Sequence, residues 1–179
     1  MYGAWRLARF DPAAMAWFNR SIEGVWHSFW AAVIAYPAFI ILLALKIAPE
    51  QWAASGVLRI LLVQSIGYVI AWVAFPLVIL PFCRWLERDD QCLVFIIAYN
   101  WSQVLQVAAT LAVAALAAAA ILPGPLMSFV EFATEIALLV YEWYIARTAL
   151  EAGGVAATAV VLLDLVLAFG MGEVTQGLY

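Results

Sequence analysis

The chain has 179 residues, of which 68% are hydrophobic and 11% charged, with a formal net charge of −4. Soluble domains carry about 25% charged residues, so this composition excludes an ordinary soluble domain, which would expose too much apolar surface in water. The composition instead predicts an all-α polytopic membrane protein whose main partner is the lipid bilayer, and no basic patch indicates nucleic-acid binding.

Residues 1–24 differ from the rest because arginines alternate there with large aromatic side chains: Trp5, Arg6, Arg9, Phe10, Trp17, Phe18 and Arg20. Asp11-Pro12 is typical of a helix start, with an N-cap followed by proline in the first turn. Arginines among aromatics favour a short amphipathic helix at the membrane interface over a flexible polar tail. The sequence therefore predicts a cytoplasmic or interfacial segment over 1–24 and a transmembrane domain over 25–179.

Five apolar segments follow, each long enough to cross the roughly 30 Å hydrocarbon core as a helix. We predict spans at 27–47, 56–83, 91–122, 126–149 and 155–174. Pro37 is expected to kink the first, and Pro76 and Pro81 to bend or end the second. The small residues Ala108, Ala112, Ala115 and Ala119 give the third a face suited to close helix packing.

The distribution of lysine and arginine predicts the orientation, because short cytoplasmic loops are enriched in these residues. An N-terminus inside the cell places six of them on the cytoplasmic side: Arg6, Arg9, Arg20, Arg84, Arg88 and Arg147. Lys46 and Arg59 fall on the other side. Five spans then put the C-terminus in the periplasm of a bacterial inner-membrane protein.

No motif for an enzyme, a cofactor or a metal is present. The chain lacks Gly-x-Ser-x-Gly, His-Glu-x-x-His and Walker patterns. Cys83 and Cys92 flank a turn predicted to be cytoplasmic and are expected to be free thiols. His27, the only histidine, is remote from both in sequence, so we expect no metal site and no cofactor.

The sharpest polar feature is an acidic stripe on the fourth predicted span. Glu131, Glu135 and Glu142 fall within about 40° of one another on a helix, and Asp164 lies near the middle of the next span. By depth, their expected partners are Asn100, Gln103 and Arg59. These seven residues form a candidate intramembrane polar site, because charged side chains within a bilayer usually face the bundle interior.

Two interpretations of this stripe remain open. Carboxyls and amides that bond across packed helices act as interhelical glue, worth about 1 kcal/mol per contact. The same groups also suit a relay for protons or cations, or a path for a polar substrate, and Asp164 is then the central residue.

Two stretches resemble a known family. AYNWSQVLQ at 98–106 is similar to the third span of the Yip family, and YEWYIARTALEAGGVAATAVVLLDLVLAFGMG at 141–172 is similar to its last two spans. These five-span proteins include partners of Rab-type GTPases and have bacterial relatives. The resemblance implies an interaction role rather than an enzyme, without a GTPase partner, because this chain lacks a long N-terminal cytoplasmic domain.

The sequence thus predicts a small non-enzymatic membrane protein of Yip-like plan that acts through other membrane proteins or self-association. The first alternative is a transporter or permease subunit coupled to protons or ions, with a small-molecule or ion substrate. The second alternative is an accessory subunit of an energy-converting membrane complex.

Overall fold

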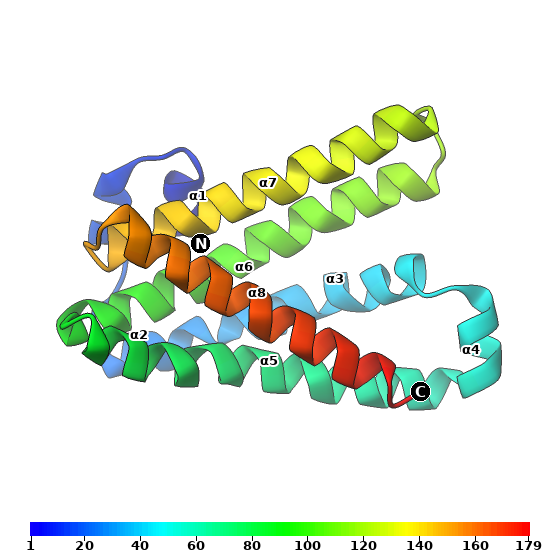
Figure 1. Cartoon of the computed structure of the whole chain (residues 1–179), viewed down its shortest axis with the longest axis horizontal. Helices are drawn as coiled ribbons and strands as arrows, with labels where there is room; N and C mark the ends of the chain where they lie inside the picture. Colours follow the sequence, from blue (N-terminus) through cyan, green and yellow to red (C-terminus); the bar gives the residue numbers. More distant parts are fainter.

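The computed structural model describes all 179 residues as a helical bundle without strands (Figure 1). Its segments are α1 (Tyr2–Ala8), η1 (Pro12–Trp17), α2 (Ile22–Ser28), α3 (Trp30–Lys46), α4 (Pro49–Ser55), α5 (Val57–Trp85), α6 (Asp89–Ala118), α7 (Gly124–Ala149) and α8 (Gly154–Gln176).

Five helices are long and apolar enough to cross a membrane, which confirms the predicted all-α polytopic bundle. The first span comprises α2 and α3 together and begins at Ile22, where the Ser21 hydroxyl accepts the backbone N–H of Gly24. Helix α6 ends at Ala118, four residues before the predicted end of the third span. Pro76 and Pro81 do not end α5, which continues to Trp85.

Helix α6 is the central element of the bundle. It packs against α3, α5 and α7, and also against α1 and α2. Helices α3 and α5 are joined by hydrogen bonds, in which the Tyr68 hydroxyl donates to the Ala32 carbonyl at 2.7 Å. Helix α8 packs against both α5 and α7 and runs across the front of the bundle in Figure 1.

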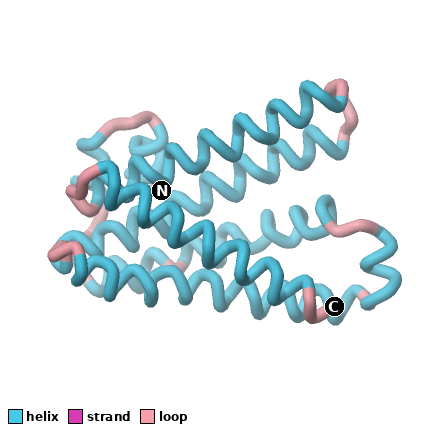
Figure 2. The backbone as a smooth tube through the Cα atoms, viewed as in Figure 1, coloured by secondary structure: helices cyan, strands magenta, loops and turns pink.

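The hydrophobic core lies at the end of the bundle that carries the N-terminus. It is formed mainly by the first half of α6 and the second half of α7, around Phe95, Ile145 and Leu150, all 0% exposed. Toward the other end, few residues of α6 and α7 are buried. Figure 2 shows the consequence, because the α6–α7 hairpin separates there from α3 and α4.

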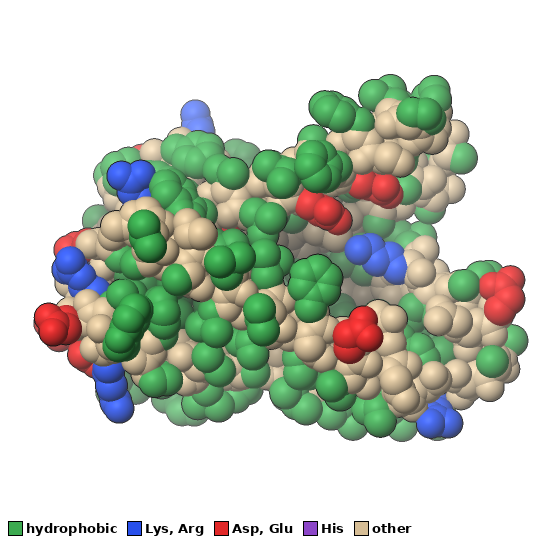
Figure 3. Space-filling view, in the orientation of Figure 1, with side chains coloured by type: hydrophobic (Ala, Val, Ile, Leu, Met, Phe, Trp, Pro, Cys, Tyr) green, Lys and Arg blue, Asp and Glu red, His purple; other side chains and the backbone are tan.

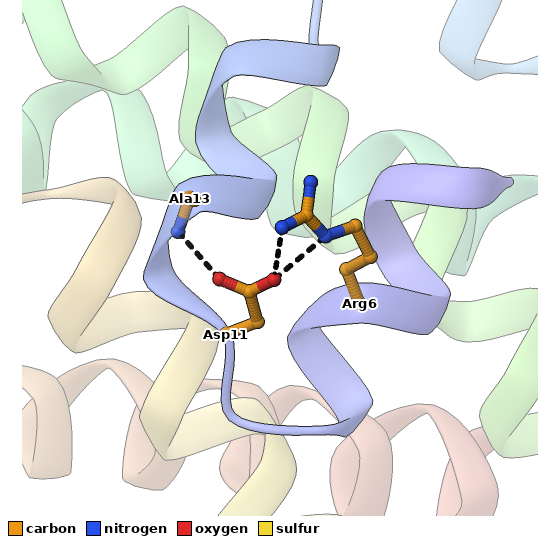
Figure 4. Close-up of polar contacts among 3 residues, drawn as sticks. All are labelled: Arg6, Asp11 and Ala13. Atoms are coloured by element: carbon orange, nitrogen blue, oxygen red, sulfur yellow. Dashed lines mark hydrogen bonds and ion pairs between the residues drawn. The ribbon is translucent and has the colours of Figure 1, made fainter.

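The N-terminal segment folds over the core as two short helices. Asp11 caps η1 as predicted, since its side chain accepts the backbone N–H of Ala13, and Pro12 occupies the first turn (Figure 4). Leu7 and Met15 are buried, and the Tyr141 hydroxyl of α7 donates to the Ala4 carbonyl of α1 at 2.8 Å. The segment therefore packs against α6 and α7.

Candidate functional site

A polar cleft lies between the α6–α7 hairpin and the end of α3. Its volume is about 300 Å³. The residues that line it come from α3, α6 and α7: Lys46, Thr110, Val113, Ala114, Glu131, Thr134, Glu135 and Leu138. Figure 3 shows acidic and basic side chains around the hollow between the hairpin and the other helices. We call this feature the polar cleft.

The geometry of α7 explains why two carboxyls face the cleft together. Glu131 and Glu135 are four residues apart, so they lie on one side of the helix, and both side chains are exposed. Their distances from the start of α7 are roughly 10 and 16 Å at about 1.5 Å per residue. Both carboxyls therefore lie within a membrane-spanning helix rather than in a loop.

The charges in the polar cleft are unbalanced. Lys46 is the one basic residue that lines it, against two glutamates. None of the three forms an ion pair, because the ion pairs of the structure are Arg6–Asp11 and Arg84–Asp89. Hydrocarbon cannot solvate such groups, since a charged side chain in the bilayer centre costs several kcal/mol. Water or a polar partner therefore suits the cleft better than lipid chains do.

A second polar cluster is buried between α6, α7 and α8. The Tyr99 hydroxyl donates to Asp164 Oδ1 at 2.7 Å. Glu142 is only 4% exposed, its Oε1 atom has no hydrogen-bond partner, and its carboxyl lies close enough to Asp164 to interact with it electrostatically. Phe75 stacks on the Tyr99 ring with 4.1 Å between centroids, which fixes the position of the hydroxyl.

A small cavity adjoins this cluster. It has a volume of about 200 Å³ and lies between α5, α6 and α8, where Tyr99, Gln103 and Asp164 supply its polar lining. Its other lining residues are Ala71, Ala74, Phe75, Leu167, Ala168 and Met171. No lysine or arginine lines it, so Asp164 has the Tyr99 hydroxyl as its hydrogen-bond donor and no cation beside it.

Asn100 has a different environment from the acidic residues. It is fully buried, and its Nδ2 donates to Ser28 Oγ at 2.8 Å, while Ser28 donates to the Val25 carbonyl. Its Oδ1 atom has no partner. These bonds connect α6 to α2, so Asn100 takes part in helix packing.

Arg59 does not line the polar cleft. Its Nε and Nη2 atoms donate to the Leu178 carbonyl at 3.0 and 2.7 Å, and Gln64 donates to the Tyr179 hydroxyl at 2.8 Å. Arg59 thus holds the C-terminal residues against the start of α5 through hydrogen bonds. The predicted site is therefore divided: Glu131 and Glu135 face the cleft, Glu142, Asp164 and Gln103 lie at the buried cluster, and Asn100 and Arg59 bind elsewhere.

Sequence reasoning missed Lys46 and Tyr99 as members of these sites. Lys46 is the last residue of α3, and its charge so close to an apolar run was the available signal. Tyr99 lies within the AYNW stretch, and a tyrosine in the middle of a span needs a hydrogen-bond partner for its hydroxyl. Thr110 and Thr134 gave no comparable signal, because threonine is common in transmembrane helices.

Comparisons of the chain with protein-family models, with characterised proteins and with solved structures give no match. Five apolar helices are long enough to cross a membrane, and all of them except α6 carry exposed large hydrophobic side chains, which identifies an integral membrane protein in contact with the lipid bilayer.

Proposed function

We propose that this protein is a non-enzymatic membrane protein of Yip-like plan that binds another membrane protein, or a second copy of itself, through the polar cleft. The observation that supports this role is the exposure of Glu131 and Glu135 at membrane depth, opposite a single Lys46. We propose a bacterial inner membrane as its location, with the N-terminus in the cytoplasm and the C-terminus in the periplasm.

A transmembrane helix with a basic or amide side chain suits this cleft chemically. Such a helix would give the two carboxylates hydrogen-bond donors and exclude lipid from between α3 and α7. Polar contacts between membrane helices contribute about 1 kcal/mol each, so two or three of them would stabilise a specific complex.

Site-specific photo-crosslinking in native membranes tests this proposal. A photo-reactive residue at Val113 lies in the cleft, whereas one at Val166 of α8 is exposed on another face and serves as the matched control. We expect a protein adduct from Val113 and mainly lipid adducts from Val166. Mass spectrometry then distinguishes a different protein from a second copy of this chain.

Charge variants complete the test. Glu131→Gln together with Glu135→Gln should reduce the Val113 adduct several-fold, while Glu173→Gln, which changes an exposed glutamate on α8, should leave it unchanged. The proposal is wrong if Val113 gives no protein adduct, or if the adduct is the same in all these variants.

The buried cluster favours a second candidate, a proton- or ion-coupled transporter subunit. The specific observation is the bond from Tyr99 to Asp164 near the unpartnered Glu142 carboxyl, with a cavity alongside. In proteoliposomes with a pH-sensitive dye inside, Asp164→Asn and Glu135→Gln should each abolish proton-linked flux, and Glu151→Gln in the α7–α8 turn is the control. Unchanged flux in both variants would exclude this function.

A further inference from the structure

An apolar groove lies where α1 crosses α6 and α7. Its volume is about 590 Å³, which is in the range of small-molecule sites, and ten of the eleven residues that line it are hydrophobic. Trp5 comes from α1, Phe10 from the turn that follows α1, Ala108 and Ala109 from α6, and Ala137 from α7. We call this feature the α1 groove; it is separate from the polar cleft, although Leu138 lines both.

The groove exists because the short alanine side chains of α6 and α7 lie opposite the large aromatic side chains of Trp5 and Phe10. Alanines on α6 and α7 leave the space between these helices unfilled beneath α1. The Tyr141–Ala4 hydrogen bond holds α1 in place, and the Phe10 ring packs edge-on against Tyr144 with centroids 4.9 Å apart. Trp5 and Phe10 are more than half exposed, so the groove opens toward the surrounding lipid.

The N-terminal segment that borders the groove carries two arginines, Arg6 and Arg9. Arg6 is occupied, because its Nε donates to Asp11 Oδ2 at 2.6 Å and its Nη2 forms an ion pair with the same oxygen (Figure 4). Arg9 is exposed, has no ion-pair partner, and lies between Ala8 and Phe10, both of which line the groove. The segment that borders the groove therefore carries one arginine without an ion-pair partner, among aromatic side chains typical of the membrane interface.

An apolar groove bordered by a segment with an exposed, unpaired arginine is complementary to an anionic phospholipid. Arginine binds phosphate well because its planar group donates two parallel hydrogen bonds. Basic sites beside transmembrane helices recognise anionic headgroups in this way. We propose that the α1 groove binds part of one acyl chain of an anionic phospholipid, with the lipid phosphate at Arg9.

Native mass spectrometry of the full chain tests this proposal. The protein is reconstituted in vesicles of equal amounts of phosphatidylcholine and phosphatidylglycerol and then released into mild detergent. We expect one retained phospholipid, with an about fivefold preference for phosphatidylglycerol, the effect of one basic residue near a membrane surface. Retention of no lipid, or equal retention of the two lipids, would overturn the proposal.

Variants separate the two parts of the site. Arg9→Gln should keep one lipid but lose the preference, while Ala109→Leu with Ala137→Leu should fill the groove and abolish retention. Arg20→Gln and Ala44→Leu change an exposed arginine and an exposed alanine away from the groove and should behave as the wild type. An unchanged lipid preference in Arg9→Gln, or unchanged retention in the filled groove, would contradict the proposal.

A further variant guards against misfolding of the filled groove. Phe10→Ala removes one of the large aromatic side chains opposite the alanines without adding bulk to the α6–α7 contact, and it should reduce retention of the lipid. Full retention in this variant would count against the α1 groove. None of these substitutions alters a charged residue of the polar cleft. The crosslink from Val113 therefore tests the polar cleft independently of the lipid measurements at the α1 groove.

Discussion

The contact between α5 and α8 depends on a glycine, and replacing it gives a sharp test of the fold. Gly67 is buried, and a Cβ atom there would lie 2.5 Å from the Cγ2 methyl of Thr175, with the next nearest atom 3.8 Å away. The methyl cannot turn aside freely, because the Thr175 hydroxyl donates to the carbonyls of Met171 and Gly172. We therefore expect Gly67→Ala to separate the two helices or break these bonds.

The expected change in the free energy of unfolding for Gly67→Ala is the difference between two opposed effects. Overpacking of a tight contact destabilises a protein by about 1–3 kcal/mol, while alanine in place of glycine favours a helix by about 0.5–1 kcal/mol. The expected net loss for Gly67→Ala is about 1–2 kcal/mol. Reversible unfolding in mixed micelles with increasing SDS, followed by circular dichroism, measures this change.

A second substitution should reverse the effect. Thr175→Ser removes the methyl and keeps the hydroxyl, so Gly67→Ala with Thr175→Ser should be more stable than Gly67→Ala alone, although Thr175→Ser by itself loses about 0.8 kcal/mol. Gly170→Ala on α8, where no atom lies within 4 Å of the new Cβ, is the control and should be neutral or slightly stabilising. Additive effects of the two substitutions, or wild-type stability of Gly67→Ala, would refute the reasoning.

Three further predictions concern the other end of the bundle. Asp11→Ala should destabilise the N-terminal segment by about 1 kcal/mol through loss of the helix cap, seen as faster limited proteolysis of that segment, whereas Asp11→Asn should keep the cap. Ser28→Ala should cost about 1–3 kcal/mol in the SDS assay, because it removes the one side-chain partner of the buried Asn100 amide. Cys83 and Cys92 are both buried, so a maleimide should label them slowly in the folded protein and rapidly in SDS; rapid labelling of the folded state would contradict the burial.

The spans could be predicted from the sequence because the length of an apolar helix is set by the bilayer itself. A local signal also predicted the start of η1, where Asp11 caps the helix and Pro12 occupies its first turn. The second span was predicted to end at residue 83, past both of its prolines, and α5 continues two residues further, to Trp85. A proline removes one backbone donor, but a transmembrane helix has no solvent to compete for its other hydrogen bonds and so continues.

The candidate site could be predicted only in part. Helical periodicity placed Glu131, Glu135 and Glu142 on one face of α7, and this rests on local geometry alone. The partners of these residues depend on how far the neighbouring helices lie from α7. The spacing of residues along one helix does not predict those distances between helices. Depth alone placed Arg59 near Glu131, yet Arg59 binds the C-terminal residues, and Lys46 lines the cleft instead.

The two polar sites lie along one face of α7. Which of the two proposed functions applies therefore depends on what occupies the polar cleft. Glu135 lines the polar cleft, and Glu142, about two turns further along the same face, lies in the buried cluster beside Asp164. A partner helix in the cleft would supply donors to Glu135, and the already buried Glu142 would then only help to hold α6, α7 and α8 together. Water in the cleft would instead extend a polar path toward Asp164. The occupant of the cleft therefore decides whether the acidic stripe acts in assembly or in transfer, which is why crosslinking from Val113 has priority over any flux measurement.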